Sequence, residues 1–139
     1  MNSIREQGGI RKYNARMGLV CGCQLMTGPL DPEAIRRSVE NLGYGSVVTL
    51  CAQVSGSQAG HTVAYSTDEA TALQEMFAAA EEAVKRWDAN VSLAQRLGDL
   101  IPGDISRVVV AACAEQAAAF NCCRFIADRI AERVSLLIA

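Results

Sequence analysis

The sequence is poor in aromatic residues, proline and histidine, and it has almost no net charge. Phe, Trp and Tyr make up 5% of the chain, there are three prolines and one histidine, and the formal net charge is −2. So small a charge, without a basic patch interleaved with aromatic residues, argues against nucleic-acid binding. The one histidine, His61, lies in a polar stretch without an acidic or thiol neighbour, so we expect a solvated loop residue.

Long apolar runs are also missing. No segment reaches the roughly 20 apolar residues that a membrane span requires, so no membrane association is expected. Residues 1–17 are polar and lack the apolar core of a secretory signal. We therefore expect a cytoplasmic protein whose six cysteines are reduced thiols.

What the chain does contain predicts one folded domain. It has 139 residues, and 50% are hydrophobic, which is enough to bury a core. Alanine is abundant, which indicates closely packed helices. Residues 1–17, with four basic side chains, are expected to form a mobile or added arm, and residues 18–139 a single domain.

Hydrophobic periodicity and turn residues predict an alternation of strands and helices. Apolar segments bounded by turn residues are expected to be strands at 18–27, 46–54, 90–97 and 105–113. Apolar residues at helical spacing predict helices from Asp31-Pro32 to Gly43, over 69–87 and over 115–134. This order, with one further short strand before the second helix, predicts an α+β fold whose helices pack on a mixed, largely antiparallel sheet.

Each predicted helix has a set of residues expected to face the core. In the first helix they are Ile35, Val39 and Leu42. In the second they are Leu73, Met76, Phe77, Ala80, Val84 and Trp87. In the third they are Phe120, Cys123, Ile126, Ala127, Ile130 and Val134.

Two cysteine pairs are candidates for metal or sulfur chemistry. Cys21 and Cys23 are separated by one residue in a predicted strand, so they are expected to share one face. Cys122 and Cys123 are adjacent on a predicted helix, where their side chains diverge. Neither spacing is that of a closed zinc site, so buried apolar thiols are favoured and no cofactor or metal is expected.

Several segments occur in an order and at spacings that define a family pattern. Residues 45–55 match a strand of the form G-A-hydrophobic-hydrophobic-T-F-x-G-x-V-R, and residues 95–104 match H-R-hydrophobic-G-x-L-x-x-G-D/E. Glu115-Gln116 and Ala119-Phe120 stand where that pattern has H-R and A-F, and 128–138 where it has D-x-L-K and P-x-W-K. Over about residues 25–138, the chain thus resembles the large subunit of molybdopterin synthase.

The resemblance implies a hammerhead-like α/β domain with an additional antiparallel sheet. It also implies a homodimer that carries small ubiquitin-like sulfur-carrier subunits. In that family the carrier's Gly-Gly tail enters the large subunit as a thiocarboxylate. Its sulfur is transferred to cyclic pyranopterin monophosphate, which forms the dithiolene that holds molybdenum.

The chain departs from the pattern where that chemistry needs positive charge. The family's arginine, histidine, His-Arg pair and two lysines are replaced, in that order, by Ser55, Gln95, Glu115, Gln116, Ala131 and Ile138. Arg96 is the one charged pocket residue that carries over. It is a candidate anion-binding residue, or else a structural arginine paired with Asp99 or Asp104.

The leading hypothesis is a non-catalytic, homodimeric homologue that binds or scaffolds other proteins, with a small sulfur carrier as one partner. One alternative is an active synthase subunit in which Arg11, Lys12, Arg129 or another subunit replaces the missing cations. The other alternative is a thiol-based metal or persulfide carrier that uses Cys21 and Cys23.

Overall fold

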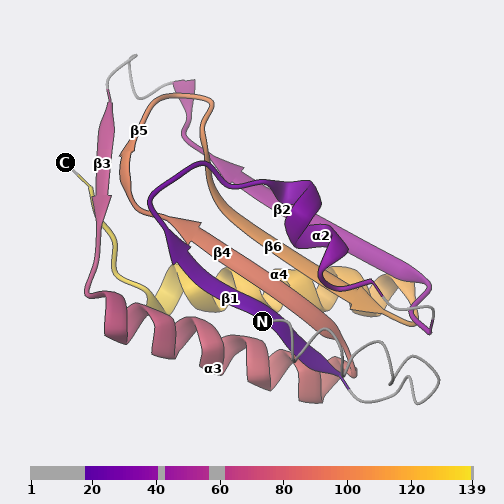
Figure 1. Ribbon diagram of the computed structural model, residues 1–139. Coiled ribbons are helices and arrows are strands. Elements are labelled where there is room, and N and C mark those ends of the chain that lie inside the picture. Colours follow the sequence, from indigo (N-terminus) through magenta and orange to yellow (C-terminus); the bar gives the residue numbers. More distant parts are fainter. Residues whose placement is uncertain (1–17, 41–42, 57–61, 139) are drawn as a thin grey trace.

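The main sheet has four strands and mixed pairing. The computed structural model describes residues 18–40, 43–56 and 62–138 (Figure 1). β1 and β4 are parallel, whereas β6 is antiparallel to both β4 and β2. The predicted α+β fold with a mixed, largely antiparallel sheet is therefore confirmed. In spatial order the strands are β1 (Leu19–Met26), β4 (Asn90–Arg96), β6 (Ile105–Cys113) and β2 (Ser46–Gln53).

A second, three-stranded sheet lies beyond the end of β4 (Figure 1). It is antiparallel, as the additional sheet was expected to be, and β5 follows β4 after one residue. The predicted turn after β4 thus contains a short strand, and positive φ angles of 94° at Gly98 and Gly103 let the chain reverse there. The strand order is β5 (Gly98–Leu100), β3 (Val63–Ser66) and β7 (Leu137–Ile138).

The helices cover the two faces of the main sheet unequally (Figure 1). α3 (Glu69–Trp87) and α4 (Gln116–Arg133) pack side by side on one face, and the short α2 (Pro32–Arg37) covers part of the other. β6 is therefore buried on both faces over 108–113, as its continuous apolar sequence indicates. Within the described ranges, no helix is both long enough and apolar enough to cross a membrane.

α2 is shorter than predicted. Its start is as expected, because the Asp31 carboxylate accepts hydrogen bonds from two N–H groups of the first turn. The regular helix ends at Arg37, well before the glycines that were expected to stop it. The Ser38 N–H and hydroxyl both bond to the Ile35 carbonyl, which tightens the last turn and ends the α-helical pattern. Leu42 lies outside the described residues.

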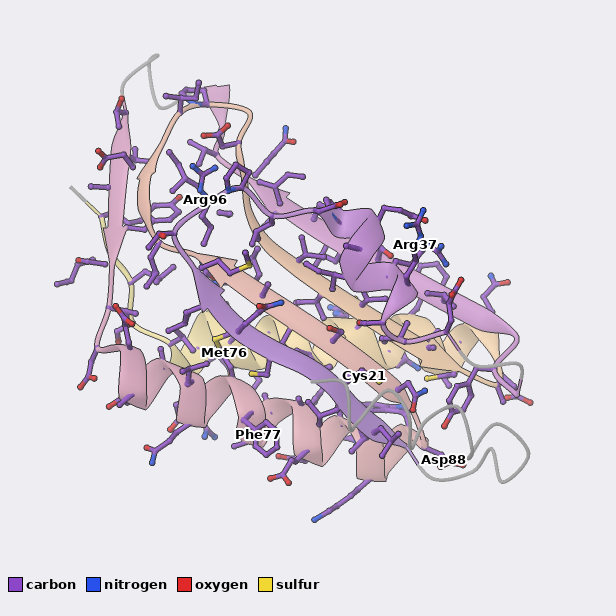
Figure 2. All side chains as sticks on the ribbon, in the orientation of Figure 1. Cys21, Arg37, Met76, Phe77, Asp88 and Arg96 are labelled. Carbon is purple, nitrogen blue, oxygen red and sulfur yellow. The ribbon has the colours of Figure 1, made fainter. Side chains whose placement is uncertain are left out.

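The buried faces of the long helices differ from the prediction. Leu73, Phe77 and Phe120 were expected inside but are 38%, 44% and 55% exposed, and Phe77 points away from the sheet (Figure 2). Most of the α3 residues that face the protein core are small instead. Their small side chains let α3 pack closely against β1 and α4. The buried residues of α3 are Ala72, Met76, Ala79, Ala80 and Ala83.

Candidate functional site

Gln95, the residue in place of the family histidine, is a buried hydrogen-bonding hub near the end of β4. Its side chain is 1% exposed. The amide nitrogen donates to the carbonyls of Arg96 (3.1 Å) and Ser106 (3.0 Å). Two carbonyl acceptors fix which end of the amide is the nitrogen, so Oε1 has to point the other way. There Oε1 accepts a 2.7 Å hydrogen bond from Nε of Arg107.

Arg107 is the site residue that sequence reasoning missed. It lies on β6 directly opposite Gln95 and is only partly exposed. Burial lowers the pKa of its guanidinium, and nearby Tyr65 of β3 opposes that shift. Across the described residues, no carboxylate forms an ion pair with Arg107. One signal was available: Arg107 is the only charged residue in the apolar run Ile105–Cys113.

Arg96 is held by the turn that follows β5. Its Nη1 lies 3.5 Å from Oδ2 of Asp104, and its side chain is 15% exposed. The same Oδ2 also accepts a hydrogen bond from the Ile101 N–H (3.0 Å), which fixes the carboxylate. Of the two structural partners considered for Arg96, Asp104 is the one observed. Within the described part of the chain, Nε of Arg96 (labelled in Figure 2) is buried and has no hydrogen-bond partner, so the donors of this guanidinium are not all satisfied.

The other replaced positions divide between the two ends of the main sheet. Ser55 follows β2, Ala131 lies in the last turn of α4, and Ile138 lies in β7 opposite Tyr65; these belong to the Arg96 end. Glu115 and Gln116 begin α4 at the other end, and both are exposed. α4 has 18 residues, which makes it about 27 Å long. A single chain therefore does not bring all the family's positions into one site.

Cys21 and Cys23 do not share a face, contrary to prediction. The register of β1 against β4 shifts between Val20 and Gly22, which is a β-bulge with Cys21 as the extra residue. Cys21 therefore packs on the α2 side of the sheet and Cys23 on the α3/α4 side. Burial raises the pKa of each thiol to about 11. Two protonated thiols on opposite faces of a sheet cannot ligate one ion.

The remaining buried cysteines also behave as core residues. Cys113, Cys122 and Cys123 all lie in the cluster beneath α3 and α4. A hydrogen bond with Cys113, together with burial, raises the pKa of Cys122, and burial raises the pKa of Cys123 to about 11. Among the described residues, no group of three or more Cys, His, Asp or Glu side chains is arranged to hold a metal ion.

Comparison with known proteins identifies the family. The family described as "MoaE protein" matches residues 25–133. This chain belongs to the MoaE family. The resemblance to the large subunit of molybdopterin synthase is therefore confirmed. No curated protein sequence matches this MoaE-family chain closely enough to count as a relative.

Solved structures agree on the fold. A molybdopterin synthase from Staphylococcus aureus has a TM-score of 0.77 at 19% identity, covering 82% of this chain and 86% of that one. A MoaE protein from Burkholderia ambifaria gives 0.72 at 18% identity, with 86% and 90% covered. A complex of subunits 1 and 2 of molybdopterin-converting factor from Helicobacter pylori gives 0.65 at 16%, with 76% and 74% covered.

Among the residues that the structure describes, the Arg96 end of the sheet in this MoaE-family chain has guanidinium groups but no lysine. Its two lysines are Lys12 and Lys85. Lys12, like Arg11 and His61, lies outside the described residues, and Lys85 lies in the last turn of α3, at the opposite end of the sheet. A guanidinium stays protonated, so the described residues at this end can bind an anion but include no amine to move a proton or form a covalent adduct.

Arg129, one of the cations considered as a replacement, is already engaged. Its Nη1 lies 2.9 Å from Oε1 of Glu82, and its guanidinium stacks on the Phe125 ring at 4.5 Å. The ion pair joins α4 to α3, and the stacking contact within α4 fixes the guanidinium in place. Arg129 therefore clamps the two helices together, and we assign it a structural role.

Proposed function

We propose that this MoaE-family chain is a molybdopterin-synthase-like subunit that binds a partner protein without transferring sulfur itself. The observation that carries the proposal is that the described residues of the site include no amine. The family lysines are Ala131 and Ile138 here, and the one lysine of the described residues, Lys85, lies at the far end of α3. Neither an alanine nor an isoleucine can donate a proton or capture a carbonyl carbon.

The negative charge of Glu115, one of the replaced positions at the start of α4, supports the same proposal. Glu115 is exposed at the start of α4, where it makes no side-chain capping hydrogen bond. A carboxylate there is favourable for the helix dipole but repels a phosphate or a thiocarboxylate. Within the family pattern, this position is a histidine. A site for two anions would therefore be weaker here, while the surface remains suited to protein contacts.

The partner we favour is a small sulfur-carrier protein. The Helicobacter pylori relative is described as a protein–protein complex of subunits 1 and 2 of molybdopterin-converting factor. A shared fold makes an equivalent assembly the first one to test for this chain. We further propose that the assembly is cytoplasmic.

A homodimer is part of the proposal. Because α4 separates Glu115 and Gln116 from the Arg96 end by about 27 Å, only a second copy could complete a composite site. The edge strand β2 also exposes Val47 and Leu50, each 41% accessible, in a position where another chain could pair or pack. Analytical ultracentrifugation tests this directly, because a monomer at micromolar concentration would contradict the proposed homodimer.

Two assays test the function together. Calorimetry with candidate sulfur carriers should show saturable binding, and expression in a strain lacking the large subunit should not restore molybdoenzyme activity. The Staphylococcus aureus synthase large subunit serves as the positive control in both. The absence of binding to any carrier would contradict the proposal of a sulfur-carrier partner. Restored molybdoenzyme activity at matched expression would contradict the proposal that the chain is non-catalytic.

One observation favours a second candidate, an active sulfur transferase. Arg107 supplies a cation at the Arg96 end that the family pattern does not predict, and no carboxylate of the described residues neutralises it. With a proton donor from another subunit, such a site could retain turnover. The complementation assay separates the two candidates.

A further inference from the structure

We infer that Arg107 is the anchor of an oxyanion-binding site at the junction of β4, β6 and β3, and that its ligand carries a carboxylate or a phosphate group. The inference deepens the proposed function and rests on it, because it names the chemical class that this end of the sheet receives. The family pattern given above assigns no residue to position 107, so Arg107 is a site residue that this pattern does not supply.

The first argument is the way in which Arg107 is held. Gln95 accepts from Nε at 2.7 Å, and Gln95 is itself fixed by two backbone carbonyls. This contact uses the Nε side of the guanidinium, and among the described residues the two Nη groups make no hydrogen bond or ion pair. The Nη pair is the part of the fork that binds both oxygens of a planar carboxylate or two oxygens of a phosphate. The group is thus positioned before a ligand arrives.

The second argument is the choice of acceptor. A buried arginine in a structural role is normally paired with a carboxylate, because removing a guanidinium from water is unfavourable unless its charge is balanced. Here the buried partner is the neutral amide of Gln95. It satisfies one donor and fixes the orientation, yet it leaves the full positive charge in place. A neutral anchor holding a cation is the arrangement expected where an anionic ligand provides the missing charge.

The third argument is the surroundings of Arg107. Tyr65 of β3 is close enough to interact electrostatically with it, and Tyr65 pairs directly with Ile138 of β7. Ile138 holds the position of the family's terminal lysine. Arg107 and Ile138 are thus both neighbours of Tyr65, so Arg107 supplies a positive charge at the end of the sheet where the family pattern has this lysine. The neighbouring cation Arg96 is neutralised by Asp104, so Arg107 is the better anion receptor of the two.

The test uses the whole chain labelled with ¹⁵N in arginine and follows the Nε–H resonances by NMR. The Arg107 signal is assigned by its loss in Arg107→Gln. Three probes are titrated at constant ionic strength: inorganic phosphate, a short uncharged peptide with a free C-terminal carboxylate, and the same peptide as its amide. The matched control is Arg124→Gln, which removes the same charge from an exposed position, where the side chain is 83% accessible.

We expect the Arg107 resonance to shift saturably with phosphate or with the free-carboxylate peptide, but not with the amide. Affinity should fall at least about tenfold in Arg107→Gln and stay unchanged in Arg124→Gln. Phosphate alone would point to a small-molecule ligand, and the peptide alone to a chain terminus. The inference is overturned if neither anion moves the Arg107 resonance, or if Arg107→Gln binds as tightly as the wild type.

Two further readouts keep the outcome interpretable. If Arg107→Gln fails to fold, Arg107→Lys replaces it, because this variant keeps the charge but loses the forked guanidinium and its Nε–H resonance. The titration of the wild-type protein then still shows whether an anion shifts the Arg107 resonance. Because the titration needs no partner protein, its result is independent of the carrier-binding calorimetry. Carrier binding without an Arg107 shift would leave the proposed function standing and remove this inference.

Discussion

The Gln95–Arg107 pair can be tested by a double-mutant cycle on stability. Replacing Gln95 with Leu removes the acceptor from a partly buried guanidinium and the donor from two backbone carbonyls. Hydrogen bonds to charged groups contribute about 1.5–3 kcal/mol and neutral ones about 1 kcal/mol. Leu recovers part of this loss through apolar burial. We therefore expect Gln95→Leu to lower the free energy of unfolding by about 3 kcal/mol.

Arg107→Met should behave very differently. It removes a cation whose desolvation no carboxylate offsets, and it keeps the apolar stem that packs on β6. The remaining penalty is the unpaired Oε1 of Gln95, about 1 kcal/mol. In the double variant the charged pair is gone but the two backbone carbonyls still lack the Gln95 donor, so its free energy of unfolding should fall by about 1–2 kcal/mol. The expected coupling energy is thus about 2–3 kcal/mol.

Urea unfolding followed by circular dichroism measures all four corners of the cycle. The midpoints should move while the slope of free energy against urea stays constant, because the folded and unfolded surfaces barely change. The reasoning is refuted if the two single effects add to within about 0.5 kcal/mol, since the residues would then be independent. An Arg107→Met variant more than about 3 kcal/mol less stable would also show that Arg107 is retained for stability rather than for a ligand.

Three further predictions concern the core and the thiols. Met76→Ala should lower the free energy of unfolding by about 2–5 kcal/mol because Met76 is 0% exposed. In the same urea assay, Phe77→Ala should lower it by less than about 1 kcal/mol because Phe77 is 44% exposed. Gly18→Ala places a Cβ 2.2 Å from the Ala89 carbonyl oxygen and should lower the melting temperature markedly, whereas Gly28→Ala, with open space around it, should not. Urea midpoints should fall from pH 9 toward pH 11. Burial raises the pKa of three thiols from the usual 9.0 to about 11, so in this range ionisation favours the unfolded chain. Equal midpoints at pH 8 and pH 10.5 would contradict this. The three thiols are those of Cys21, Cys23 and Cys123.

Most element types, and the boundaries of the second predicted helix, could be predicted because local signals mark them. The helix predicted over 69–87 is α3, Glu69–Trp87, and its N-cap Asp68 accepts from the Thr71 N–H and hydroxyl. The antiparallel pairing of β4 with β6 also follows from the predicted strand order. Punctuation by Gly and Pro and hydrophobic periodicity act over a few residues, so one sequence carries them in full.

Features that depend on pairing between distant segments could not be predicted. The bulge at Cys21 exists only relative to β4, so alternation along β1 alone placed Cys21 and Cys23 on the same face. The inner face of α3 was assigned to large apolar residues such as Phe77, but close packing against α4 selected alanines. In both cases the local pattern was real and the tertiary contact decided its orientation.

The candidate site was predicted in outline and missed in its most distinctive residue. The family pattern located Gln95 and Arg96, and the ion pair of Arg96 with Asp104 was among the expected alternatives. Arg107 lay in a strand that was read only for its apolar character. Its importance arises from its neighbour across the sheet, Gln95, and that register is a property of the folded sheet.

The most direct test of the account uses purified protein, a thiocarboxylated sulfur carrier and cyclic pyranopterin monophosphate in one reaction, with carrier binding measured in parallel by calorimetry. The account predicts a saturable complex and no dithiolene product, because Ala131 and Ile138 stand where the family pattern has lysines. Dithiolene formed at a rate comparable to that of the Staphylococcus aureus synthase would contradict it.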